Sequence, residues 1–501
     1  MNRAVIGASL FLGLSAGCKG VIAPENSKPN IVFILADDMG YGDIQALNRE
    51  SKAPTPNLDN LVNEGVNFTD AHTNSAVCTP TRYGILTGRY CFRSRLKKGV
   101  LTGYQPSLIE ENRTTVASLL KTADYKTACI GKWHLGLDWE KKKQNIPLVT
   151  GGGKYAPACT ENVNFDGSVK GGPSDHGFDY EYILPASLDM PPYVFVENQK
   201  VVNKPSAKVD AKRDTICRGV LYRKGDIASD FKHENVLQQI VTKAKNYIVS
   251  NSKKEQPFFL YLPLTAPHTP WLPSKAFRNK SQAGVYGDFV CMVDDMVGQI
   301  ESTLKKAGIT ENTILVFTSD NGSHWMKSDI ERFQHLANAD RRGMKSDLYE
   351  GGHRVPFIVK WPQRIKAKAN CDEVICTTDF MATCAEIVGY DLDSNEGEDS
   401  RSFLSYLIEP AKELSQRAII HHSVDGSFAI RQGDWKYLDC KGSGGWTYPN
   451  KIANKKEDKN QLYKIKEDHF ESLNQIDAYP AKADSLKALL YKYINQGHSK
   501  N

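Results

Sequence analysis

The sequence predicts an α/β fold: a large central, mostly parallel sheet flanked by helices, followed by a smaller C-terminal antiparallel sheet with one helix. Three observations lead to this prediction. Several short runs are continuously apolar and rich in β-branched or aromatic residues, which is typical of strands buried on both faces. Helix-spaced apolar residues lie between these runs, as expected for βαβ units. After residue 400 the alternation gives way to strands and a single helix.

The composition is that of a folded globular protein. The chain has 501 residues, of which 40% are hydrophobic and 24% charged, so disorder and fibrous repeats are excluded as overall descriptions. Its formal net charge of +6 is small and evenly spread for this length. We therefore expect no nucleic-acid partner and no electrostatic attachment to a membrane.

Four runs are expected to form strands of the central sheet. Asn30–Ala36 and Thr313–Ser319 are continuous and β-rich. Pro257–Leu264 and Val355–Trp361 have a similar composition. Their prolines affect where these two strands end, because proline cannot donate a hydrogen bond within a sheet.

Helices are expected between the strands. Apolar residues recur at near-helical spacing over Asp230–Asn251, and Val285–Ala307 and Thr377–Val388 follow the same pattern. Two long stretches rich in Gly, Pro, Lys and Asn, Trp139–Pro173 and Leu184–Thr215, are expected to be surface loops that shape a substrate pocket.

The C-terminal part has a different pattern. Arg417–His422 and Ser427–Leu438 are expected to be strands, and Ala481–Asn495 an amphipathic helix. We therefore predict a main domain over residues 22–400 and a C-terminal subdomain over residues 401–501.

The first residues have the features of an export signal. One early positive charge is followed by an uncharged apolar run that ends in small residues at Ser15, Ala16 and Gly17. The run is too short to span a bilayer. Cys18 follows directly, as in bacterial lipoproteins, so residues 1–18 predict an exported protein with a lipid anchor at Cys18. An ordinary cleaved signal with an incidental cysteine is the alternative. We expect a periplasmic or cell-surface location.

Polar residues follow several of the expected strands. In open α/β sheets, ligands bind at the carboxyl ends of the strands, where such residues meet. One of these segments alone would be read as a turn, but four together predict a functional site. The segments are Asp37-Asp38, Lys132-Trp133-His134 (after a further run, Thr127–Gly131), Ala266-Pro267-His268 and Asp320-Asn321-Gly322.

These residues fall into two chemical classes. The first consists of oxygen donors: Asp37, Asp38, Asp320 and Asn321. They suit a hard cation such as calcium or magnesium better than zinc, and three crowded carboxylates without a cation would repel one another. The second class consists of basic side chains: Lys132, His134, His268 and Lys345. A divalent cation beside fixed positive groups is what sulfuryl or phosphoryl transfer requires.

One segment carries a family signature. Ser75–Arg89 contains C-x-P-x-R at Cys78, Pro80 and Arg82, followed by L-T-G-R. This segment resembles the signature of the formylglycine-dependent sulfatases, the arylsulfatase-like branch of the alkaline phosphatase superfamily. The resemblance implies an alkaline phosphatase-like fold and hydrolysis of sulfate esters.

Further elements of that family occur in the same order along the chain. The resemblance extends from Asn30 to Trp361, and the whole chain looks most like bacterial sulfatases of the N-acetylgalactosamine-6-sulfatase and arylsulfatase A group. The matching elements are G-K-W-H-L-G at Gly131–Gly136, A-P-H at Ala266–His268, S-D-N-G at Ser319–Gly322, G-x-K at Gly343–Lys345 and a late segment at Ile430–Lys436.

The resemblance implies a role for each matched catalytic residue. Cys78 would be oxidised to formylglycine by a maturation enzyme, and the hydrated aldehyde would attack sulfur and later expel sulfate by re-forming its carbonyl. Arg82 and Lys132 would hold the modified residue, and His134 would be the base of the second step. The helix expected to begin at Pro80 would place Cys78 near a positive helix end.

The other matched residues would contact the sulfate group or a cation. Lys345 and His268 would bind the sulfate, with His268 placed to protonate the leaving alcohol. For Lys345 the alternative is a solvated basic run with Arg341 and Arg342. Calcium, with magnesium as the alternative, would be held by Cys78 in its modified form and by Asp37, Asp38, Asp320 and Asn321.

Substrate choice depends on loops rather than on the fold. The resemblance implies a sulfated glycan, and we expect a 6-O-sulfated galactose or N-acetylgalactosamine unit. Candidate pocket residues are His176, the loop Ser187–Tyr193, and His324 and Trp325, of which Trp325 would stack on a sugar ring. Ordinary loop packing is the alternative for all of them.

Three other functions are considered. The first is a sulfatase for another sulfate position or for an aryl sulfate. The second is a phosphate or phosphonate ester hydrolase of the same superfamily. The third is a catalytically silent glycan-binding protein, which is disfavoured because every matched position is present. Apart from Cys18 and Cys78, nine of the 11 cysteines remain. In an oxidising compartment some of them can pair, but because nine is an odd number at least one stays free unless it bonds another chain.

Overall fold

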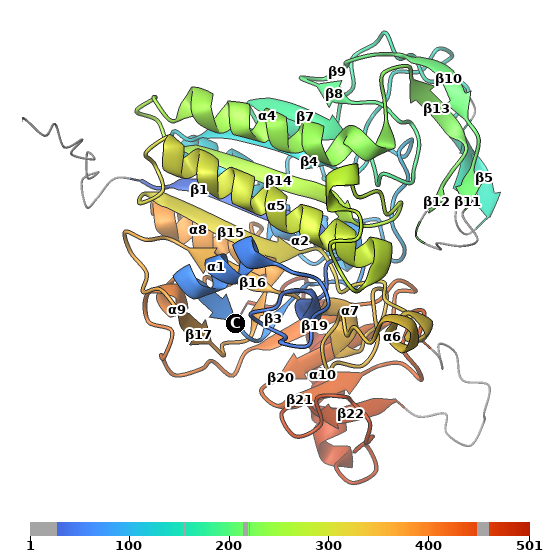
Figure 1. The fold of residues 1–501 in the computed structure, drawn as a ribbon. Coiled ribbons are helices and arrows are strands. Elements are labelled where there is room, and N and C mark those ends of the chain that lie inside the picture. The colour runs from blue at the N-terminus through green and yellow to red at the C-terminus, as the bar shows by residue number, and fades with distance from the viewer. Residues whose placement is uncertain are drawn as a thin grey trace, which may run out of the picture.

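A ten-stranded sheet forms the centre of the protein (Figure 1). The computed structural model describes residues 28–153, 156–159, 161–213, 219, 221–447 and 460–500. In spatial order the strands are β17 (Ala369–Cys371), β2 (Val66–Phe68), β16 (Phe357–Lys360), β15 (Thr313–Ser319), β1 (Asn30–Asp37), β14 (Phe258–Pro267), β4 (Lys126–Lys132), β7 (Tyr180–Leu184), β8 (Val196–Glu197) and β9 (Lys200–Val201).

The middle of this sheet is parallel. Strands β15, β1, β14, β4 and β7 run in one direction, with Phe33 of β1 opposite Tyr261 on one side and Val316 on the other. All residues of β14 and β15 are buried, which explains why their sequences are continuously apolar. Antiparallel pairing occurs toward the edges, at β16, β8 and β9. The predicted mostly parallel α/β sheet is confirmed.

Helices cover both faces of the sheet, with α4 and α5 in front and α8 behind in the view of Figure 1. The front helices are α1 (Pro56–Glu64), α4 (Val236–Asn251) and α5 (Gly284–Lys306). The opposite face carries α2 (Cys78–Thr87), α3 (Val116–Thr122) and α8 (Phe380–Val388). Three short helices lie in connections: α6 (Lys327–Phe333), α7 (Glu350–His353) and α9 (Leu404–Ile408).

The predicted helices are present, but two of them begin later than expected. The helix predicted from Asp230 begins at Val236, because a 3-10 turn at His233–Asn235 precedes it. The helix predicted from Thr377 likewise starts with a 3-10 turn at Thr377–Asp379. The apolar spacing continues through these tighter turns, so periodicity alone does not locate the first α-helical residue.

The two long stretches expected to be surface loops contain strands, so that prediction is wrong in part. The first holds a hairpin, and the second supplies β8 and β9 to the central sheet. Most residues of β10 are exposed, so no continuous apolar run in the sequence marks it as a strand. The additional strands in these stretches are β5 (Val149–Gly153), β6 (Ala156–Cys159), β10 (Pro205–Val209) and β11 (Lys212–Arg213). Beyond Thr215, β12 (Leu221–Tyr222) pairs with β11 and β13 (Gly225–Ala228) pairs with β10.

The predicted C-terminal antiparallel sheet with one helix is confirmed. Its four strands are β19 (Ala418–His422), β20 (Phe428–Gln432), β21 (Trp435–Leu438) and β22 (Gln461–Lys464), and its helix is α10 (Pro480–Asn495). The run Ser427–Leu438 is two strands rather than one, because the chain turns at Gly433, which has φ +56°. The domain boundary at residue 400 stays a prediction.

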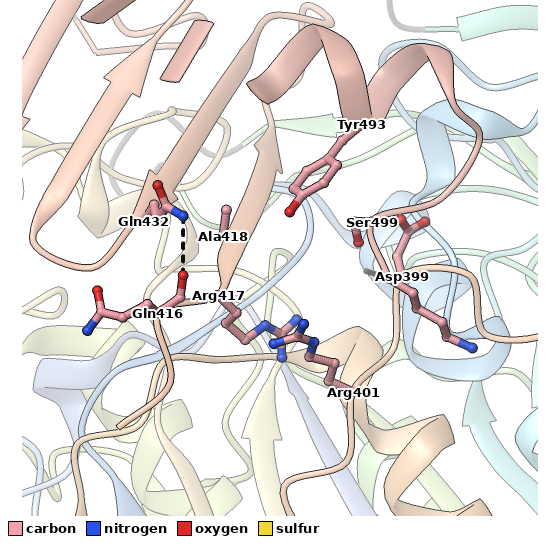
Figure 2. A pocket seen from close by; sticks show the side chains of 9 residues that line it. Asp399, Arg401, Gln416, Arg417, Ala418, Gln432, Tyr493 and Ser499 are labelled. Atoms are coloured by element: carbon pink, nitrogen blue, oxygen red, sulfur yellow. Dashed lines mark hydrogen bonds between the residues drawn. The ribbon is translucent and has the colours of Figure 1, made fainter. Parts of the chain in front are cut away.

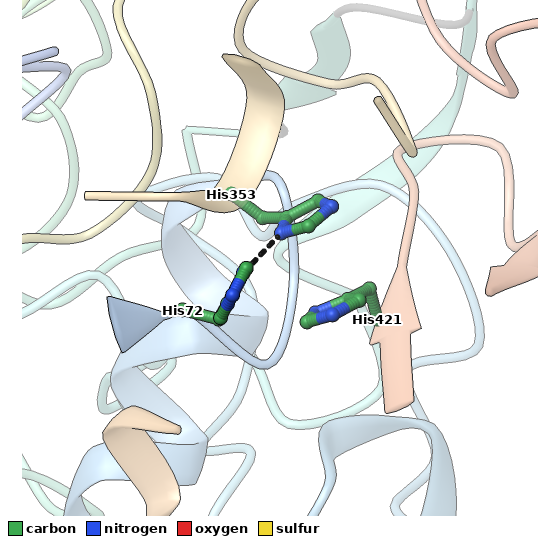
Figure 3. A group of neighbouring side chains, drawn as sticks. All are labelled: His72, His353 and His421. Carbon is green, nitrogen blue, oxygen red and sulfur yellow. Dashed lines mark hydrogen bonds between the residues drawn. The ribbon is translucent and has the colours of Figure 1, made fainter. Parts of the chain in front are cut away.

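A buried cluster of three histidines lies between this sheet and the main domain (Figure 3). His72 ends β3 (Ala71–His72), a strand that pairs with β18 (Ile375–Cys376). The Nδ1 atom of His72 is 3.0 Å from Nδ1 of His353, which ends α7. The ring of His353 stacks on that of His421 of β19, with centroids 3.8 Å apart and planes at 12°.

Charged residues surround the three rings. At one end, Arg431 donates to both carboxylate oxygens of Asp70, at 2.8 and 2.6 Å, and Asp70 accepts from His72 Nε2 at 2.7 Å. At the other end, Lys436 Nζ lies 3.0 Å from His353 Nε2. The same amine is 2.9 Å from the carboxylates of both Glu350 and Glu471. His353 Nε2 is also 3.0 Å from the carbonyl oxygen of Leu348. Neutral imidazoles fit this setting between Lys436 and Arg431, and the two flanking cations disfavour a bound metal ion.

Lowering the pH from 7.5 to 5.5 is expected to destabilise the fold through this cluster. Burial holds the pKa values of His353 and His421 well below the usual 6.5. The unfolded chain binds a proton at each of these residues below pH 6.5, whereas the folded chain does not. The stability that each provides is therefore complete above pH 6.5 and is lost below it by up to about 1.4 kcal/mol per pH unit. Glu471 acts in the opposite direction, because burial raises its pKa from 4.5 to about 7.

The His421→Phe variant isolates one of these titrations, since phenylalanine keeps an aromatic ring against His353. Urea unfolding of both proteins at pH 7.5, 6.5 and 5.5 gives the dependence of the unfolding free energy on pH. Below pH 6.5, the unfolding free energy of the variant should depend less steeply on pH, by the equivalent of about one bound proton. Equal slopes for the two proteins would contradict the prediction.

The N-terminal signal predicted over residues 1–18, including Cys18, lies outside the described residues. Within the ranges that are described, no helix combines the length and the apolar character needed to cross a membrane.

Cysteine pairing was expected, but no disulfide joins the cysteine side chains that the structure describes. Burial raises the pKa of several of these thiols, for example to about 12 for Cys91 and Cys376, so they remain protonated and unreactive. The unpaired residues are Cys78, Cys91, Cys129, Cys291, Cys371, Cys376, Cys384 and Cys440.

Candidate active site

The carboxyl ends of the parallel strands bring the predicted site residues together. Asp37 is the last residue of β1 and Lys132 the last of β4. His268 and Asp320 directly follow β14 and β15. Since these four strands are neighbours in one parallel sheet, their ends lie at the same edge.

Cys78 is the first residue of α2, a helix in which every residue is buried. The side chain of Asn74 crosses closely over this helix, and its Nδ2 donates to the carbonyl of Pro80 at 2.9 Å. A Cβ at Gly84 would lie 2.4 Å from Oδ1 of Asn74, so the helix needs glycine there. This packing fixes the helix N-terminus and leaves Cys78 only 2% exposed.

The thiol of Cys78 is not activated as it stands. Burial raises its pKa above the usual 9.0, and this outweighs the lowering effect of Lys132 and Lys345, while Asp320 and Asp37 raise it further. A thiol that stays protonated is a weak nucleophile. The surroundings of Cys78 are therefore unlike those of an enzyme that uses a thiolate.

Three buried cations pair with the three predicted carboxylates. Lys132 Nζ lies 2.8 and 2.7 Å from the two oxygens of Asp37. Lys345 Nζ lies 2.6 and 2.8 Å from those of Asp38, so Lys345 is not part of a solvated basic run. A similar pairing joins Arg82 to Asp320, with Nε and Nη2 at 3.1 and 2.7 Å from Oδ2.

The carboxylates differ in how readily they ionise. Burial opposes ionisation of Asp37, but Lys132, His268 and Arg82 outweigh it and hold its pKa well below the usual value. Burial and the neighbouring Asp37 raise the pKa of Asp320 to about 6. Asp320 is therefore the least readily ionised of the three carboxylates.

The oxygen donors at this edge fit a hard cation. Asn321 Nδ2 donates to Asp38 at 2.7 Å, while its Oδ1 is buried without a hydrogen-bond partner among the described residues. One ligand atom from each of Asp37, Asp38 and His268 lies within 4.8 Å of the others. Asp38 has φ +69°, a left-handed conformation that aspartate tolerates at a turn. Carboxylate and amide oxygens are what Ca²⁺ or Mg²⁺ prefers.

His134 presents a neutral ring nitrogen at the site. Its Nε2 lies 2.8 Å from the carbonyl oxygen of Leu101, so Nε2 carries the proton and Nδ1 holds a lone pair. That Nδ1 is buried and bonds to no residue in the described part of the chain. Burial, reinforced by Lys132 and Arg82, keeps the pKa of His134 well below 6.5. The ring can therefore accept a proton.

His268 lies at the more open side of the site and is 8% exposed. Its Nε2 is 3.7 Å from Oδ2 of Asp38, and its Nδ1 is 2.5 Å from the carbonyl oxygen of Thr269. Ser187 Oγ lies 3.3 Å from the same Nδ1. The ring can contact both the carboxylate set and a ligand that enters from outside.

Sequence reasoning missed two residues that position the histidines. Thr79 donates to the carbonyl of His134 at 2.9 Å and accepts from the backbone N–H of Leu101 at 3.2 Å. Thr79 occupies a variable position of the C-x-P-x-R pattern, which gives no signal for it. Ser187 lies in the candidate pocket loop, but nothing in the sequence pairs it with His268.

Two of the predicted pocket residues do not line a pocket. Trp325 is only 3% exposed, and its indole N–H donates to the carbonyl of His335 at 2.9 Å, so it cannot stack on a sugar. His176 is buried against Trp133, with ring centroids 6.4 Å apart. In both cases the alternative of ordinary packing holds.

Each of the other two candidate pocket positions contacts a neighbouring side chain. Asp189, in the loop Ser187–Tyr193, is buried and forms an ion pair with Arg223. His324 is half-buried, and its ring centroid lies 4.9 Å from that of Trp446.

A helix N-terminus, oxygen donors and buried cations at one sheet edge suit the binding of an anionic group beside a divalent cation. A model of the family described as Sulfatase matches residues 29–390. Because this match covers most of the chain, the protein belongs to the sulfatase family.

Similarity to individual proteins extends over nearly the whole chain. The chain is 32% identical over 522 aligned residues to N-acetylgalactosamine-6-O-sulfatase from Bacteroides thetaiotaomicron, with 96% of each chain covered. It is 30% identical to human steryl-sulfatase over 79% of this chain and 72% of that protein. A solved B. thetaiotaomicron structure, described under metabolism of multiple glycosaminoglycans, is similar with a TM-score of 0.79 and 31% identity, covering 93% of this chain and 99% of that one.

Proposed function

We propose that this protein removes sulfate from sulfated glycans, acting on 6-O-sulfated galactose or N-acetylgalactosamine, with Cys78 converted to formylglycine. The observation that carries the proposal is the setting of Cys78. Its thiol is buried and protonated, yet it lies at a helix N-terminus among Lys132, Lys345 and Arg82. These cations suit a bound sulfate group, whereas the thiol itself is unsuited to attack it.

Conversion of the thiol to an aldehyde supplies what the thiol lacks, because an aldehyde hydrate can attack sulfur with one hydroxyl and release sulfate by re-forming its carbonyl. Lys132 and Arg82 hold the modified side chain in position. The neutral Nδ1 of His134 takes the proton that must leave as the carbonyl re-forms. Each of these residues is already fixed by a buried ion pair or hydrogen bond.

Two further residues act on the sulfate group and on the alcohol that leaves. Lys345, fixed by Asp38, places a positive charge near Cys78 and stabilises the charged oxygens of the sulfate. His268 is the more exposed of the two site histidines and protonates the departing alcohol.

A divalent cation, calcium by preference, would supply further stabilisation of charge on the sulfate oxygens. The residues that would hold it are Asp37, Asp38, Asp320 and Asn321, with the modified Cys78. The buried and unsatisfied Oδ1 of Asn321 supports this assignment, as no described residue bonds to it.

The substrate assignment rests on the relatives and on one surface feature. The similarity to a 6-O-sulfatase of N-acetylgalactosamine covers almost the full length of both chains. Beside the site, the backbone N–H of Trp446 donates to Ser346 Oγ at 2.9 Å, next to Lys345. The Trp446 side chain is 36% exposed and offers the aromatic face that Trp325 cannot provide. Export to the periplasm or cell surface, with a lipid anchor at Cys18, suits a glycan substrate.

Mass spectrometry of the peptide that contains Cys78 tests the chemistry. In protein purified from its native host, we expect an aldehyde in place of the thiol, and reaction with a hydrazide reagent should label this peptide. The Cys91 peptide, from the same helix-rich region, is the internal control and should retain its thiol. An unmodified Cys78 in active enzyme would overturn the mechanism.

Sulfate release from a panel of sugars tests the substrate. The panel contains galactose and N-acetylgalactosamine sulfated at position 2, 4 or 6, with an aryl sulfate and a phosphate monoester as comparisons. We expect 6-O-sulfated sugars to have the highest kcat/KM. Faster cleavage at another position, or of the phosphate ester, would replace the proposed substrate.

A further inference from the structure

A second polar pocket lies at the far end of α2 from Cys78 (Figure 2). The backbone N–H of Asp399 donates to the carbonyl of Gly88, the residue that ends α2, at 2.9 Å. The ten residues of α2 therefore separate this pocket from Cys78, a distance of about 15 Å. The pocket is small, with a volume of ≈ 40 Å³.

Arg401 brings an unneutralised positive charge to this pocket. Its backbone N–H donates to Asp379 at 3.0 Å, but its guanidinium forms no hydrogen bond or ion pair with any residue that the structure describes. Arg417 faces the same space. It bonds to Asp379 through Nη1 at 2.5 Å, and its buried Nε has no partner in the described chain. The two guanidinium groups thus lie side by side, and each has N–H donors for which no described residue is an acceptor (Figure 2).

The neighbouring carboxylates are already committed to other partners. Asp399 accepts from Arg93 Nε and Nη2, both at 2.8 Å, and from the backbone N–H of Tyr90 at 2.8 Å. Asp379 accepts from Cys376 N–H at 2.7 Å in addition to Arg417 and the Arg401 backbone. Neither carboxylate is left to balance the Arg401 guanidinium.

The remaining polar lining consists of two hydroxyl groups, two glutamines and Lys500, whose Nζ donates to the carbonyl of Glu396 at 2.8 Å. The Tyr493 hydroxyl points toward the two guanidinium groups (Figure 2) and bonds to none of the described residues. Ser499 adds a second hydroxyl to the lining. Like charges held together in a partly enclosed space are unfavourable, whereas an anion between them would accept charge-assisted hydrogen bonds from both arginines.

We propose that this pocket binds a small free oxyanion of the sulfate or phosphate type, held by Arg401, the Nε of Arg417 and the Tyr493 hydroxyl. Arginine guanidinium groups match the geometry of such anions. Because Tyr493 belongs to α10 and Arg417 directly precedes β19, the anion joins the C-terminal helix and sheet to the end of α2. The site is separate from the catalytic centre and does not depend on conversion of Cys78.

Thermal unfolding in sodium sulfate, compared with sodium chloride at equal ionic strength, tests the site. An anion that binds only the folded protein raises its unfolding midpoint. The Arg401→Gln variant removes the unneutralised charge without disturbing an ion pair, so it should fold and retain basal activity. In this variant, the sulfate concentration that produces half of the shift in the unfolding midpoint should be about tenfold higher or more. The Arg278→Gln control, at an exposed arginine away from the pocket, should behave like the unmodified protein.

The comparison between variants also separates this pocket from the catalytic site, which binds sulfate in every variant. A response to sulfate that is the same in Arg401→Gln and in the unmodified protein would overturn the proposal. Phosphate should act like sulfate, whereas a rise with acetate alone would exclude a tetrahedral anion.

Two further measurements fix the identity of the ligand. In the Cys78→Ala background, in which we expect turnover to be at least about 10³-fold slower, a 6-O-sulfated sugar should give a midpoint shift that Arg401→Gln leaves unchanged. A shift that requires Arg401 would assign the pocket to sulfate groups of the glycan and overturn the free anion. Crystals soaked in selenate should show anomalous density between Arg401 and Arg417, and density at the catalytic site alone would also overturn the proposal.

Discussion

Replacing Cys78 by alanine is expected to lower kcat for sulfate release by at least about 10³-fold. Loss of a nucleophile removes the covalent route, and only binding and electrostatic stabilisation by the remaining residues are left. The side chain is small and lies at the start of α2, so the helix should persist. Sulfate release from a 6-O-sulfated sugar, measured together with the thermal unfolding midpoint, checks both parts of the prediction.

The matched control is Cys91→Ala, which removes another buried, unpaired thiol. Cys91 begins a 3-10 turn shortly after α2, and its Sγ contacts Ser94 Oγ at 3.7 Å. We expect this variant to keep nearly all of its activity. Comparable activity in the Cys78 and Cys91 variants would show that Cys78 does not form the covalent intermediate.

Replacing Lys436 by methionine is expected to destabilise the fold by about 3–5 kcal/mol. Lys436 is buried, and its ammonium group lies 2.9 Å from both Glu350 and Glu471. Methionine fills most of the space but leaves buried Glu471 without its cation, while Glu350 keeps only its longer contacts with Arg354 and Arg431. The unfolding free energy from urea denaturation at pH 7.5 measures the loss.

The Lys466→Met control removes a lysine from the same C-terminal region. Lys466 Nζ lies 3.0 Å from Asp434, but the lysine side chain is 64% exposed and that of Asp434 37%, and such a solvent-accessible ion pair contributes little. Its unfolding midpoint should therefore stay close to that of the unmodified protein. A similar loss of stability in both lysine variants would show that the buried cluster does not hold the C-terminal sheet to the main domain.

Much of the catalytic edge could be predicted because local sequence and sheet topology carry the same information. Asp37 and Asp320 each follow a continuous apolar run, and parallel pairing of those two runs is enough to bring their carboxylates together. Arg82 could be placed beside them only through the family signature, since nothing local relates it to Asp320, which is 238 positions away.

The parts that could not be predicted depend on packing between distant segments. The link from His72 to His353 joins residues 281 positions apart, and the contact of Lys436 with Glu350 joins residues 86 apart. No periodicity marks such pairs. The prediction for Trp325 failed for the same reason. Its position next to the predicted metal motif in the sequence suggested an exposed side chain, but the indole ring packs against Tyr286, with ring centroids 4.7 Å apart.

The burial of Cys78 bears on when its proposed modification occurs relative to folding. With 2% exposure and a fully buried helix around it, the side chain is out of reach of another enzyme once the chain has folded. The proposed conversion to formylglycine therefore belongs to the period before folding, while the C-x-P-x-R segment is still an extended peptide. A chain that folds first would be trapped as an intact but inactive protein, so competition between modification and folding determines the active fraction.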